Sequence, residues 1–321
     1  MKYSTILASV GAILMSIGSG FVHAADKVVA VTSIIEHTAL DAVRDGIRES
    51  LKEAGFVEGK NLRFVFQTAQ GSPATAAQIA RKYVGDGVDV IVPISTPSAQ
   101  AVVAATRSIP VVYSAITDPV AAKLVKSWEA SGTNVTGVSD LSPIDRHLEL
   151  VRKIVPQAQR LGVIYSPGEA NSVAIIEVLR KEAKASGIDL VEAPAQRTVD
   201  IPAAALRLAG KVDAIYAPTD NNVISAIESI VKVAQQAKVP LIAADTDSVK
   251  RGATAALGVN YLDLGRQTGR MVARVLQGEA PGQMRSEIST RLELHLNTEA
   301  ASRQGVTLSQ ELIKSAAVVI K

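Results

Sequence analysis

The stretch "VDAIYAPTDNN", Val212 to Asn222, runs from a short apolar segment into a cluster of small polar side chains. The earlier stretch "VDVIVPISTPS", Val88 to Ser98, has the same pattern. Each is followed by an amphipathic segment and then by a second apolar run, "VPLIAADTDSV" in the later copy and "IPVVYSAITDP" in the earlier one. Apolar runs that alternate with amphipathic segments are typical of parallel sheets covered by helices on both faces. The chain is therefore predicted to contain two similar α/β units, one over about 27–140 and one from about 141 onward.

Apolar and amphipathic segments alternate from Val28 to Ala244. The predicted buried strands are Val28–Ile35, Leu62–Gln67, Val88–Ser95, Pro110–Ile116, Leu161–Ser166, Ile188–Glu192, Val212–Ala217 and Pro240–Ala244. The predicted helices include Ala39–Ala54, Ala74–Val84, Ser172–Ser186 and Val223–Ala237. Gly55 and Gly187 directly follow two of these helices, as C-terminal caps do. "TGVSDLSPID", Thr136 to Asp145, is expected to cross between the units. The predicted fold class is α/β, with two doubly wound parallel-sheet lobes.

The composition is that of a globular protein of about two domains, with 321 residues of which 47% are hydrophobic. The 34 basic and 31 acidic residues are interspersed without a basic block, so nucleic acid is not an expected partner. The absence of cysteine excludes disulfides, thiolate nucleophiles and Cys-ligated metal. The four histidines lack metal-ligand spacing, and no G-x-S-x-G or G-x-G-x-x-G motif is present. No metal, cofactor or catalytic residue is therefore predicted, and an enzyme is not expected.

Residues 1–24 have the pattern of a secretory signal. Lys2 is followed by a long apolar stretch, and Val22 and Ala24 match the small-residue pattern before a cleavage site at Ala25. A transmembrane anchor is the alternative, although the apolar run of about 17 residues is at the lower limit for a span. No cysteine at the cleavage site could carry a lipid. The predicted location is therefore the periplasm.

Polar side chains follow the apolar runs at the points where the predicted strands end. In open parallel sheets, ligands bind beyond the carboxyl ends of the strands. Two lobes placed face to face would bring these groups to one cleft, so each lobe is expected to supply half of a small-molecule site. The candidates at the strand ends and helix starts are Ser95, Thr96, Ser98, Thr117, Asp118, Ser139, Asp140, Asn171, Thr219, Asp220, Asn221 and Asp245.

The chemistry of this cluster narrows the class of ligand. Hydroxyl groups and free N–H groups at helix starts suit a carboxylate, whereas aspartates suit an ammonium group. Both together suit a zwitterion, of which an α-amino acid is the simplest. Aromatic residues are only 3% of the chain, which makes a sugar site less expected, and no Gly-rich phosphate cradle is present.

Several of these candidates also fit helix capping. Thr96 and Asp118 each precede a proline, as N-cap residues do, and Asp220 is placed to cap a helix starting near Val223. Asp245 follows an apolar strand directly and is less obviously a cap, so it is the expected partner of an ammonium group. Glu36 and His37 lie where the first strand meets the first helix, and we expect them to contact ligand or cap the helix.

A set of segments in fixed order resembles the substrate-binding proteins of ABC importers, in the tryptophan/tyrosine-type branch. The set comprises "SIIEHTALDAVRDGIRESLKEAGFVEGKNL", "QIARKYVGDGVDVIVPISTPSAQAV", "ITDPVAAKLV", "NVTGVSDL", "YSPGEANSV", "GKVDAIYAPTDNNVISA" and "AADTDSVKRGATAALGVNYLDLGRQTGRM". The resemblance covers about Val28 to Gly278. It implies the type I periplasmic-binding fold, with two α/β lobes joined by a three-crossover hinge.

The resemblance also implies how the chain is divided between the lobes. The first lobe is expected over 25–140 plus about 260–285, and the second over 141–259 plus about 286–321. The third crossover is expected near Gly252–Asn260, followed by a helix at Leu262–Gln277 that returns to the first lobe. Glu287–Asn297 would then return to the second lobe as a half-exposed strand.

By the same resemblance, the hydroxyl groups of the first lobe would hold the ligand carboxylate and Asp245 the ammonium. These hydroxyl groups belong to Ser95, Thr96, Ser98 and Thr117. The implied protein is a monomer that closes on its ligand and presents it to an ABC permease in the inner membrane. The same fold binding a branched-chain amino acid or nucleoside, a sensory binding protein, and an envelope enzyme using His37 remain alternatives.

Overall fold

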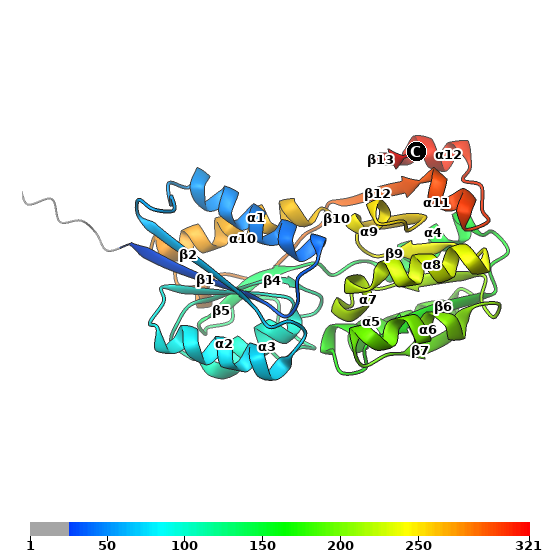
Figure 1. Ribbon diagram of the computed structural model, residues 1–321. Helices are drawn as coiled ribbons and strands as arrows, with labels where there is room; N and C mark the ends of the chain where they lie inside the picture. The colour runs from blue at the N-terminus through cyan, green and yellow to red at the C-terminus, as the bar shows by residue number, and fades with distance from the viewer. Residues whose placement is uncertain (1–25) are drawn as a thin grey trace, which may run out of the picture.

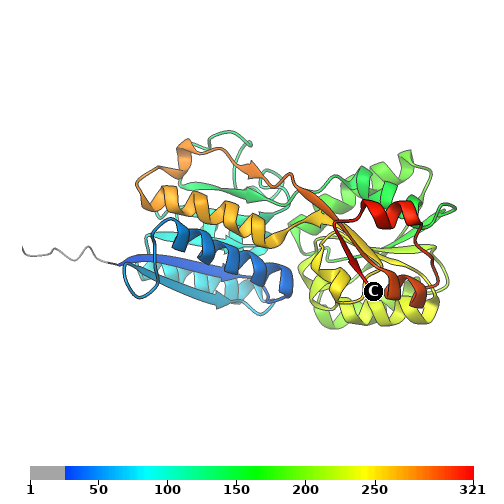
Figure 2. The ribbon, with the colours of Figure 1, turned by 90° about the horizontal axis from the view of Figure 1, so that it is seen from above.

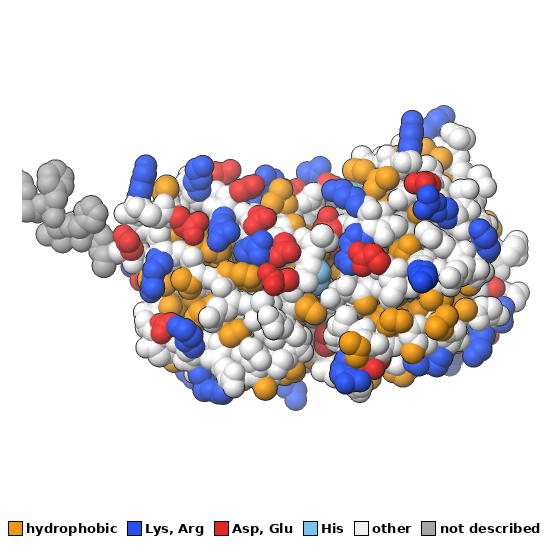
Figure 3. Space-filling view, in the orientation of Figure 1, with side chains coloured by type: hydrophobic (Ala, Val, Ile, Leu, Met, Phe, Trp, Pro, Cys, Tyr) orange, Lys and Arg blue, Asp and Glu red, His pale blue; other side chains and the backbone are white. Residues whose placement is uncertain are grey.

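The computed structural model describes residues 26–321 as two α/β lobes lying side by side (Figure 1). The predicted signal at residues 1–24 lies outside the described residues. Among residues 26–321, no helix is long and apolar enough to cross a membrane. Charged side chains of both signs are interspersed over both lobes on the face drawn in Figure 3.

The first lobe is built on a six-stranded sheet of order β11-β5-β4-β3-β1-β2, in which every pair of neighbours is parallel. Its strands are β1 Lys27–Ser33, β2 Leu62–Thr68, β3 Val90–Ile94, β4 Val111–Ile116, β5 Val135–Ser139 and β11 Glu287–Ile288. One face of the sheet packs on α1 (Thr38–Glu53) and α10 (Tyr261–Leu276). The other packs on α2 (Pro73–Gly85) and α3 (Thr96–Ala105). The inner strands β3, β4 and β5 are buried along their whole length, and β1 along most of its length, which explains their continuous apolar runs.

The second lobe is built on a seven-stranded sheet of order β13-β12-β10-β9-β8-β6-β7, in which β10 and β12 pair antiparallel. Its strands are β6 Arg160–Tyr165, β7 Asp189–Pro194, β8 Ala214–Ala217, β9 Leu241–Ala243, β10 Ala255–Val259, β12 Leu292–Asn297 and β13 Val318–Ile320. One face carries α4 Ile144–Ile154, α5 Ala170–Ala185, α11 Thr298–Arg303 and α12 Gln310–Ser315. The other carries α6 Ile201–Leu208, α7 Asn221–Ser225, α8 Ile227–Ala237 and α9 Asp247–Lys250. Short 3-10 helices lie at Thr198–Asp200 and Pro281–Gln283.

The chain passes between the two sheets three times, so the predicted fold class is confirmed. The passages follow β5, follow β10, and separate β11 from β12. Figure 2 shows them gathered at the junction of the lobes. The prediction that the third crossover lies near Gly252–Asn260 is wrong, because this passage is the second in chain order and the third lies between Ile288 and Leu292.

Three details of the predicted elements are wrong. The segment Thr136–Asp145 is not simply a crossover, because Val135–Ser139 forms β5 inside the first sheet. Glu287–Asn297 is not one strand, since its two halves pair in different sheets. The helix predicted over Val223–Ala237 is interrupted at Ala226, where α7 ends and α8 begins.

Helix α10 returns to the first lobe and packs against α1 at very close range. A Cβ atom added at Gly265 would lie 2.2 Å from the backbone oxygen of Val43, and one added at Gly46 would lie 2.2 Å from that of Leu262. Gly269 faces Ile47 and Ser50 in the same way, with an added Cβ 2.7 Å from Ser50 Cβ. Glycine is therefore required at these positions because the two backbones touch, and the apolar side chains of both helices are buried against the sheet beneath.

We expect Gly265→Ala to destabilise the protein by about 1–3 kcal/mol, because the new methyl group forces α1 and α10 apart. The matched control is Gly85→Ala, in helix α2, where an added Cβ would meet nothing within 4 Å. This control is expected to be neutral or to stabilise by about 0.5–1 kcal/mol. Urea denaturation of both variants measures the difference, and equal stabilities would contradict the close-packing argument.

Candidate ligand-binding site

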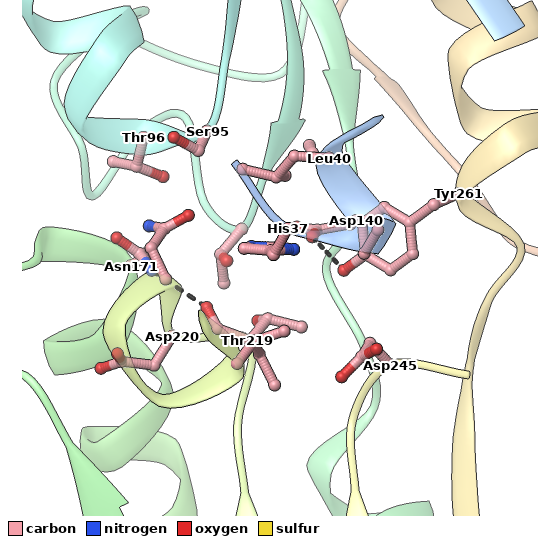
Figure 4. A pocket seen from close by; sticks show the side chains of 15 residues that line it. His37, Leu40, Ser95, Thr96, Asp140, Asn171, Thr219, Asp220, Asp245 and Tyr261 are labelled. Atoms are coloured by element: carbon pink, nitrogen blue, oxygen red, sulfur yellow. Dashed lines mark hydrogen bonds between the residues drawn. The ribbon is translucent and has the colours of Figure 1, made fainter. Parts of the chain in front are cut away.

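A pocket of about 350 Å³ lies between the two lobes, where the carboxyl ends of their parallel strands face each other (Figure 4). The predicted candidates that line it are His37, Ser95, Thr96, Thr117, Asp140, Asn171, Thr219, Asp220, Asn221 and Asp245. Ala39, Leu40, Ala115, Ile224 and Tyr261 complete the lining. The remaining candidates, Glu36, Ser98, Asp118 and Ser139, do not line this pocket.

The first-lobe wall is formed where β3 ends and α3 begins. Ser95 lies between them with φ 75° and ψ 154°, a backbone region that is populated almost only by glycine. This conformation places the first turn of α3, with its free N–H groups, against the pocket. Ser95 Oγ and Thr96 Oγ1 are buried and have no hydrogen-bond partner in the protein. The wall therefore offers two hydroxyl groups and a helix N-terminus, all suited to an anion.

Ser98 Oγ, in the first turn of α3, is likewise buried and unpartnered. The expected capping by Thr96 is not what the structure shows, because Ser95 occupies the N-cap position and no side chain caps this helix.

The opposite wall carries two buried carboxyl groups, Asp140 and Asp245 (Figure 4). The Tyr261 hydroxyl donates a hydrogen bond of 2.8 Å to Asp140 Oδ2, whereas Asp140 Oδ1 is buried without a partner. Asp245 Oδ1 accepts from Ser248 N at 2.9 Å, and Oδ2 accepts from Ser248 Oγ at 2.6 Å. Burial raises the pKa of both carboxyl groups. Asp245, which the sequence made less obviously a cap, thus bonds to the first turn of α9, although Thr246 holds the N-cap position of this helix.

His37 lies between these walls in the view of Figure 4. It occupies the N-cap position of α1 but makes no side-chain capping bond, and its Nδ1 is buried without a partner. Burial, and then the positive charge of Arg251, lower the pKa of His37 to about 3. The imidazole is therefore neutral near neutral pH and adds no charge to the pocket. Glu36 is exposed and lies away from the pocket.

The second-lobe wall is organised by Asp220. Its Oδ2 accepts from Ser166 N and Ser172 Oγ, both at 2.6 Å, and its Oδ1 accepts from Ser166 Oγ at 2.9 Å. Oδ1 also accepts from Val223 N at 3.0 Å, so Asp220 caps α7 as the sequence suggested. All four bonds hold the ends of β6 and β8 and the starts of α5 and α7 together.

Glu169 is a buried carboxyl that the sequence reasoning missed. Its Oε2 accepts hydrogen bonds from Asn171 Nδ2 at 3.1 Å, Asn221 Nδ2 at 2.6 Å and Asn221 N at 3.2 Å. Its Oε1 accepts from Asn222 Nδ2 at 3.2 Å. Burial, and then the negative charge of Asp220, raise the pKa of Glu169 to about 7. The only signal in the sequence is that Glu169 lies just before a predicted helix. This position did not indicate a buried site, because glutamate is also common there on exposed surfaces.

Two other candidates serve the crossover and a turn. Ser139 Oγ donates to the Thr117 carbonyl at 3.0 Å and accepts from Leu141 N at 3.0 Å, where the chain leaves β5. Asp118 Oδ1 accepts from Val120 N and Ala121 N, both at 2.9 Å, so it caps the turn that follows it.

A second, mostly apolar cavity adjoins the pocket and shares Thr117 and Thr219 with it. Its space, part of it open to solvent, is about 460 Å³, and it also lies between the lobes. Its remaining lining residues are Asp118, Leu141, Ser142, Ile144, Ala174, Ile175, Val178, Tyr216 and Ala244. The site thus combines a polar compartment with an apolar one. Within residues 26–321, no group of three or more His, Asp or Glu side chains is arranged to hold a metal ion.

Residues 28–320 match the family model described as ABC transporter substrate binding protein. The chain belongs to this family. The Tyrosine-binding protein of Clostridioides difficile (strain R20291) is a relative with 38% identity over 273 residues, which is 85% of this chain and 79% of that protein. The substrate-binding protein described here is thus similar along most of its length to a protein whose name states its ligand.

Two solved structures bear on the arrangement of the lobes. A Streptococcus pneumonia ABC domain in complex with L-Trp has 31% identity and a TM-score of 0.89, over 92% of this chain and 100% of that one. The ligand-free, open structure of a Clostridium difficile substrate-binding protein has 37% identity but a TM-score of only 0.70, over 92% and 99%. The more similar sequence gives the less similar structure, so the lobes here are arranged as in the Trp-bound relative more than as in the open one.

The backbone conformation of Ser95 predicts an unusual result: a glycine variant at this position is expected to be more stable than an alanine variant. We expect Ser95→Gly to be more stable than Ser95→Ala by about 1–2 kcal/mol, because glycine relieves the strain that alanine retains. Both variants lose the hydroxyl, so the comparison isolates the backbone. Thermal and urea unfolding measure it, and a more stable alanine variant would show that the backbone at residue 95 is unstrained.

The buried Glu169 also predicts a dependence of stability on pH. Its pKa is raised on folding from 4.5 to about 7, so its stabilising contribution is complete below about pH 4.5 and is lost as the pH rises through 7. We expect wild-type unfolding free energy, relative to Glu169→Gln, to fall by roughly 1–3 kcal/mol over this window. Urea denaturation at pH 4.5 and 7.5 measures the change, which a constant difference between the two proteins would contradict.

Proposed function

We propose that this substrate-binding protein holds an aromatic L-amino acid between its lobes and delivers it to the membrane permease of an ABC importer. The observation that carries the proposal is the division of one pocket between two kinds of polar group. Hydroxyl groups and a helix N-terminus lie on one wall, and buried carboxyl groups lie on the other. A zwitterion satisfies both walls at once, whereas a simple anion or cation satisfies only one.

The carboxylate of the ligand would bind at the start of α3. Ser95 Oγ and Thr96 Oγ1 are free to donate there, and the unpaired N–H groups of the first turn add to the positive end of the helix dipole. Hydroxyl donors and N–H groups together can satisfy both carboxylate oxygens. Thr117, on the neighbouring strand end, would contribute a further hydroxyl to the same wall.

The ammonium group would bind chiefly at Asp140. Both oxygens of Asp245 already accept hydrogen bonds from Ser248, but Asp140 Oδ1 has no partner. A buried carboxyl whose free oxygen faces a pocket gains most from a cation, because the cation offsets the cost of desolvating its charge. Asp245 would add a second negative charge nearby. This assignment replaces the expectation, drawn from the resemblance, that Asp245 is the principal partner.

The side chain of the ligand would occupy the adjoining apolar cavity. Ile175, Val178 and Ala244 supply apolar surface there, and the Tyr216 hydroxyl is already engaged with His147 Nδ1 at 2.6 Å. Burying a large aromatic ring in such a cavity is strongly favourable. The relatives named for tyrosine binding and solved with L-Trp support an aromatic ligand over a small aliphatic one.

Ligand binding would stabilise the closed arrangement. In the described chain, the hydrogen bonds and ion pairs between side chains stay within one lobe or at the crossovers. Ser95, Thr96 and Asp140 belong to the first lobe, whereas Asn171, Thr219 and Asp245 belong to the second. A ligand that reaches groups of both sets therefore supplies polar contacts between the lobes that the described side chains lack. Because these contacts exist only when the lobes are together, binding shifts the population toward the closed state.

The remaining parts of the proposal concern the oligomeric state, the cellular location and the absence of catalysis. The protein would act as a monomer outside the cytoplasm, in the periplasm if residues 1–24 direct export. Members of the family are solute-binding components, which supports binding without catalysis.

The first experiment is mass spectrometry of small molecules released from the purified, denatured protein, followed by thermal shift with all twenty amino acids. We expect L-tryptophan or L-tyrosine to raise the melting temperature most. If no amino acid stabilises the protein, the zwitterion proposal is wrong. Stabilisation by a branched-chain amino acid alone would overturn the aromatic assignment.

Calorimetry with the stabilising amino acid then separates the two carboxyl groups. We expect Asp140→Asn to weaken binding by about 10- to 100-fold, which corresponds to losing one charge-assisted hydrogen bond, and Asp245→Asn to weaken it less. Asp189→Asn is the control, since Asp189 is exposed at the start of β7 and lines neither the polar pocket nor the apolar cavity. Unchanged affinity in Asp140→Asn, with a large loss in Asp245→Asn, would restore Asp245 as the ammonium partner.

A further inference from the structure

We propose that Glu169 is a positioning residue: its carboxylate fixes the orientation of Asn171 and Asn221 at the pocket, and its protonation weakens ligand binding. The inference rests on the proposed function, because it takes the polar pocket to be the ligand site. Glu169 itself does not line that pocket. It lies directly behind the two asparagines that do, at the start of α5.

The first step concerns what Asn171 presents to the pocket. Its Nδ2 donates to Glu169 Oε2 at 3.1 Å and to the Thr219 carbonyl at 3.0 Å, so both amide hydrogens are engaged by the protein itself (Figure 4 shows the bond to Thr219). Its Oδ1 is buried without a partner. An ionised carboxylate can only accept hydrogen bonds, so it holds the NH2 group on its own side and leaves the carbonyl oxygen for the ligand.

The second step concerns Asn221, whose backbone N and Nδ2 both donate to Glu169 Oε2. Together with Asn171 and Asn222, four N–H donors converge on the two carboxylate oxygens. A proton on Oε2 displaces at least one of the three donors there, and a protonated carboxyl is a weaker acceptor for all four than a carboxylate. It can also donate to an amide oxygen, which removes the reason for Asn171 to keep its present orientation.

The third step concerns the balance between the two forms. The four donors favour the ionised carboxylate, but burial and the neighbouring Asp220 disfavour it more, which brings the pKa of Glu169 to about 7. Asp220 is the charged group that faces it from the β8–α7 segment. Helix α3, which approaches α5 from the first lobe, has the sequence "TPSAQAVVAA" and carries no charged side chain. Both forms of Glu169 are therefore populated near neutral pH.

Other titratable groups at the pocket must be separated from Glu169. The pKa of His37 is lowered to about 3, so this residue stays neutral through the range of interest. Burial raises the pKa of both Asp140 and Asp245, so these carboxyl groups can add a pH dependence of their own. A pH profile of the wild type alone is thus not sufficient, and the Glu169 contribution is defined by comparison with a variant.

The test measures the affinity for L-tryptophan and L-tyrosine by calorimetry from pH 5.5 to 8.5, in wild type, Glu169→Gln and Glu192→Gln. If only the ionised form supports tight binding, wild-type Kd rises by about tenfold from pH 8 to pH 6, as expected for a single proton with a pKa near 7. Glu169→Gln, which cannot ionise, is expected to bind more weakly at pH 8 and to lose this step. Glu192→Gln is the control, because Glu192 pairs with Arg180 on the surface of the same lobe and is expected to keep the wild-type profile.

A second measurement does not require the ligand. The side-chain amide resonances of Asn171 and Asn221, assigned by NMR with Asn→Ser variants, are expected to shift with a midpoint near pH 7 in wild type but not in Glu169→Gln. Circular dichroism checks that Glu169→Gln is folded.

The outcomes distinguish the two proposals. Binding of neither amino acid to the wild type contradicts the proposed function, and the amide resonances then still decide the orientation of the asparagines. Normal binding, with the same affinity and pH profile in wild type and Glu169→Gln, leaves the proposed function intact and overturns the role of Glu169. Amide resonances that do not titrate near pH 7 in wild type would also overturn it.

Discussion

The hydrogen bond from Tyr261 to Asp140 connects two of the three passages between the lobes. Asp140 is the residue at which the chain leaves β5, and Tyr261 is the first residue of α10 after the chain returns from β10. Both side chains are buried and line the pocket, so this one hydrogen bond stabilises both the wall of the site and the junction of the lobes. The residues that hold this junction are therefore also residues that would meet the ligand.

The buried polar groups of the cleft are of two kinds, those with hydrogen-bond partners in the protein and those without, and burying the second kind costs more stability. Asp220 and Asp245 have their oxygens occupied by neighbouring N–H and hydroxyl groups, so their burial is compensated within one lobe. Ser95, Thr96 and Asn171 each keep a buried oxygen without a partner, and Ser95 also has a strained backbone. Unpaired buried oxygens reduce stability. Their concentration at one pocket indicates that this part of the protein favours binding over stability.

The sequence was most informative where the same pattern, an apolar run followed by small polar residues, occurs twice. The apolar runs that end in Thr219 and in Ser95 predicted parallel strands with polar groups at their carboxyl ends, and the structure brings both ends to the same pocket. Strand β5 was missed because Thr136, Gly137 and Ser139 interrupt its apolar run, although the strand is buried in the sheet. Glu169 was missed because its burial depends on Asn221 and Asn222, which are distant in sequence. The bonds of Asp245 to Ser248 were not foreseen because they depend on the local turn that leads into α9. The split of Glu287–Asn297 between two sheets depends on tertiary pairing, which alternation of residues does not determine.

The glycine contact between α1 and α10 also bears on the order in which the chain can fold. Arg266 on α10 bonds to Glu49 on α1 across 217 residues of sequence, so the first lobe cannot bury one face of its sheet until nearly the whole chain is available. Most strands of the second sheet, by contrast, come from the continuous segment between β6 and β10. Contacts between residues distant in sequence form slowly because a long loop must close first. The lobe that begins the chain therefore waits for α10, which follows most strands of the second sheet, and until then part of one apolar face of its sheet stays uncovered.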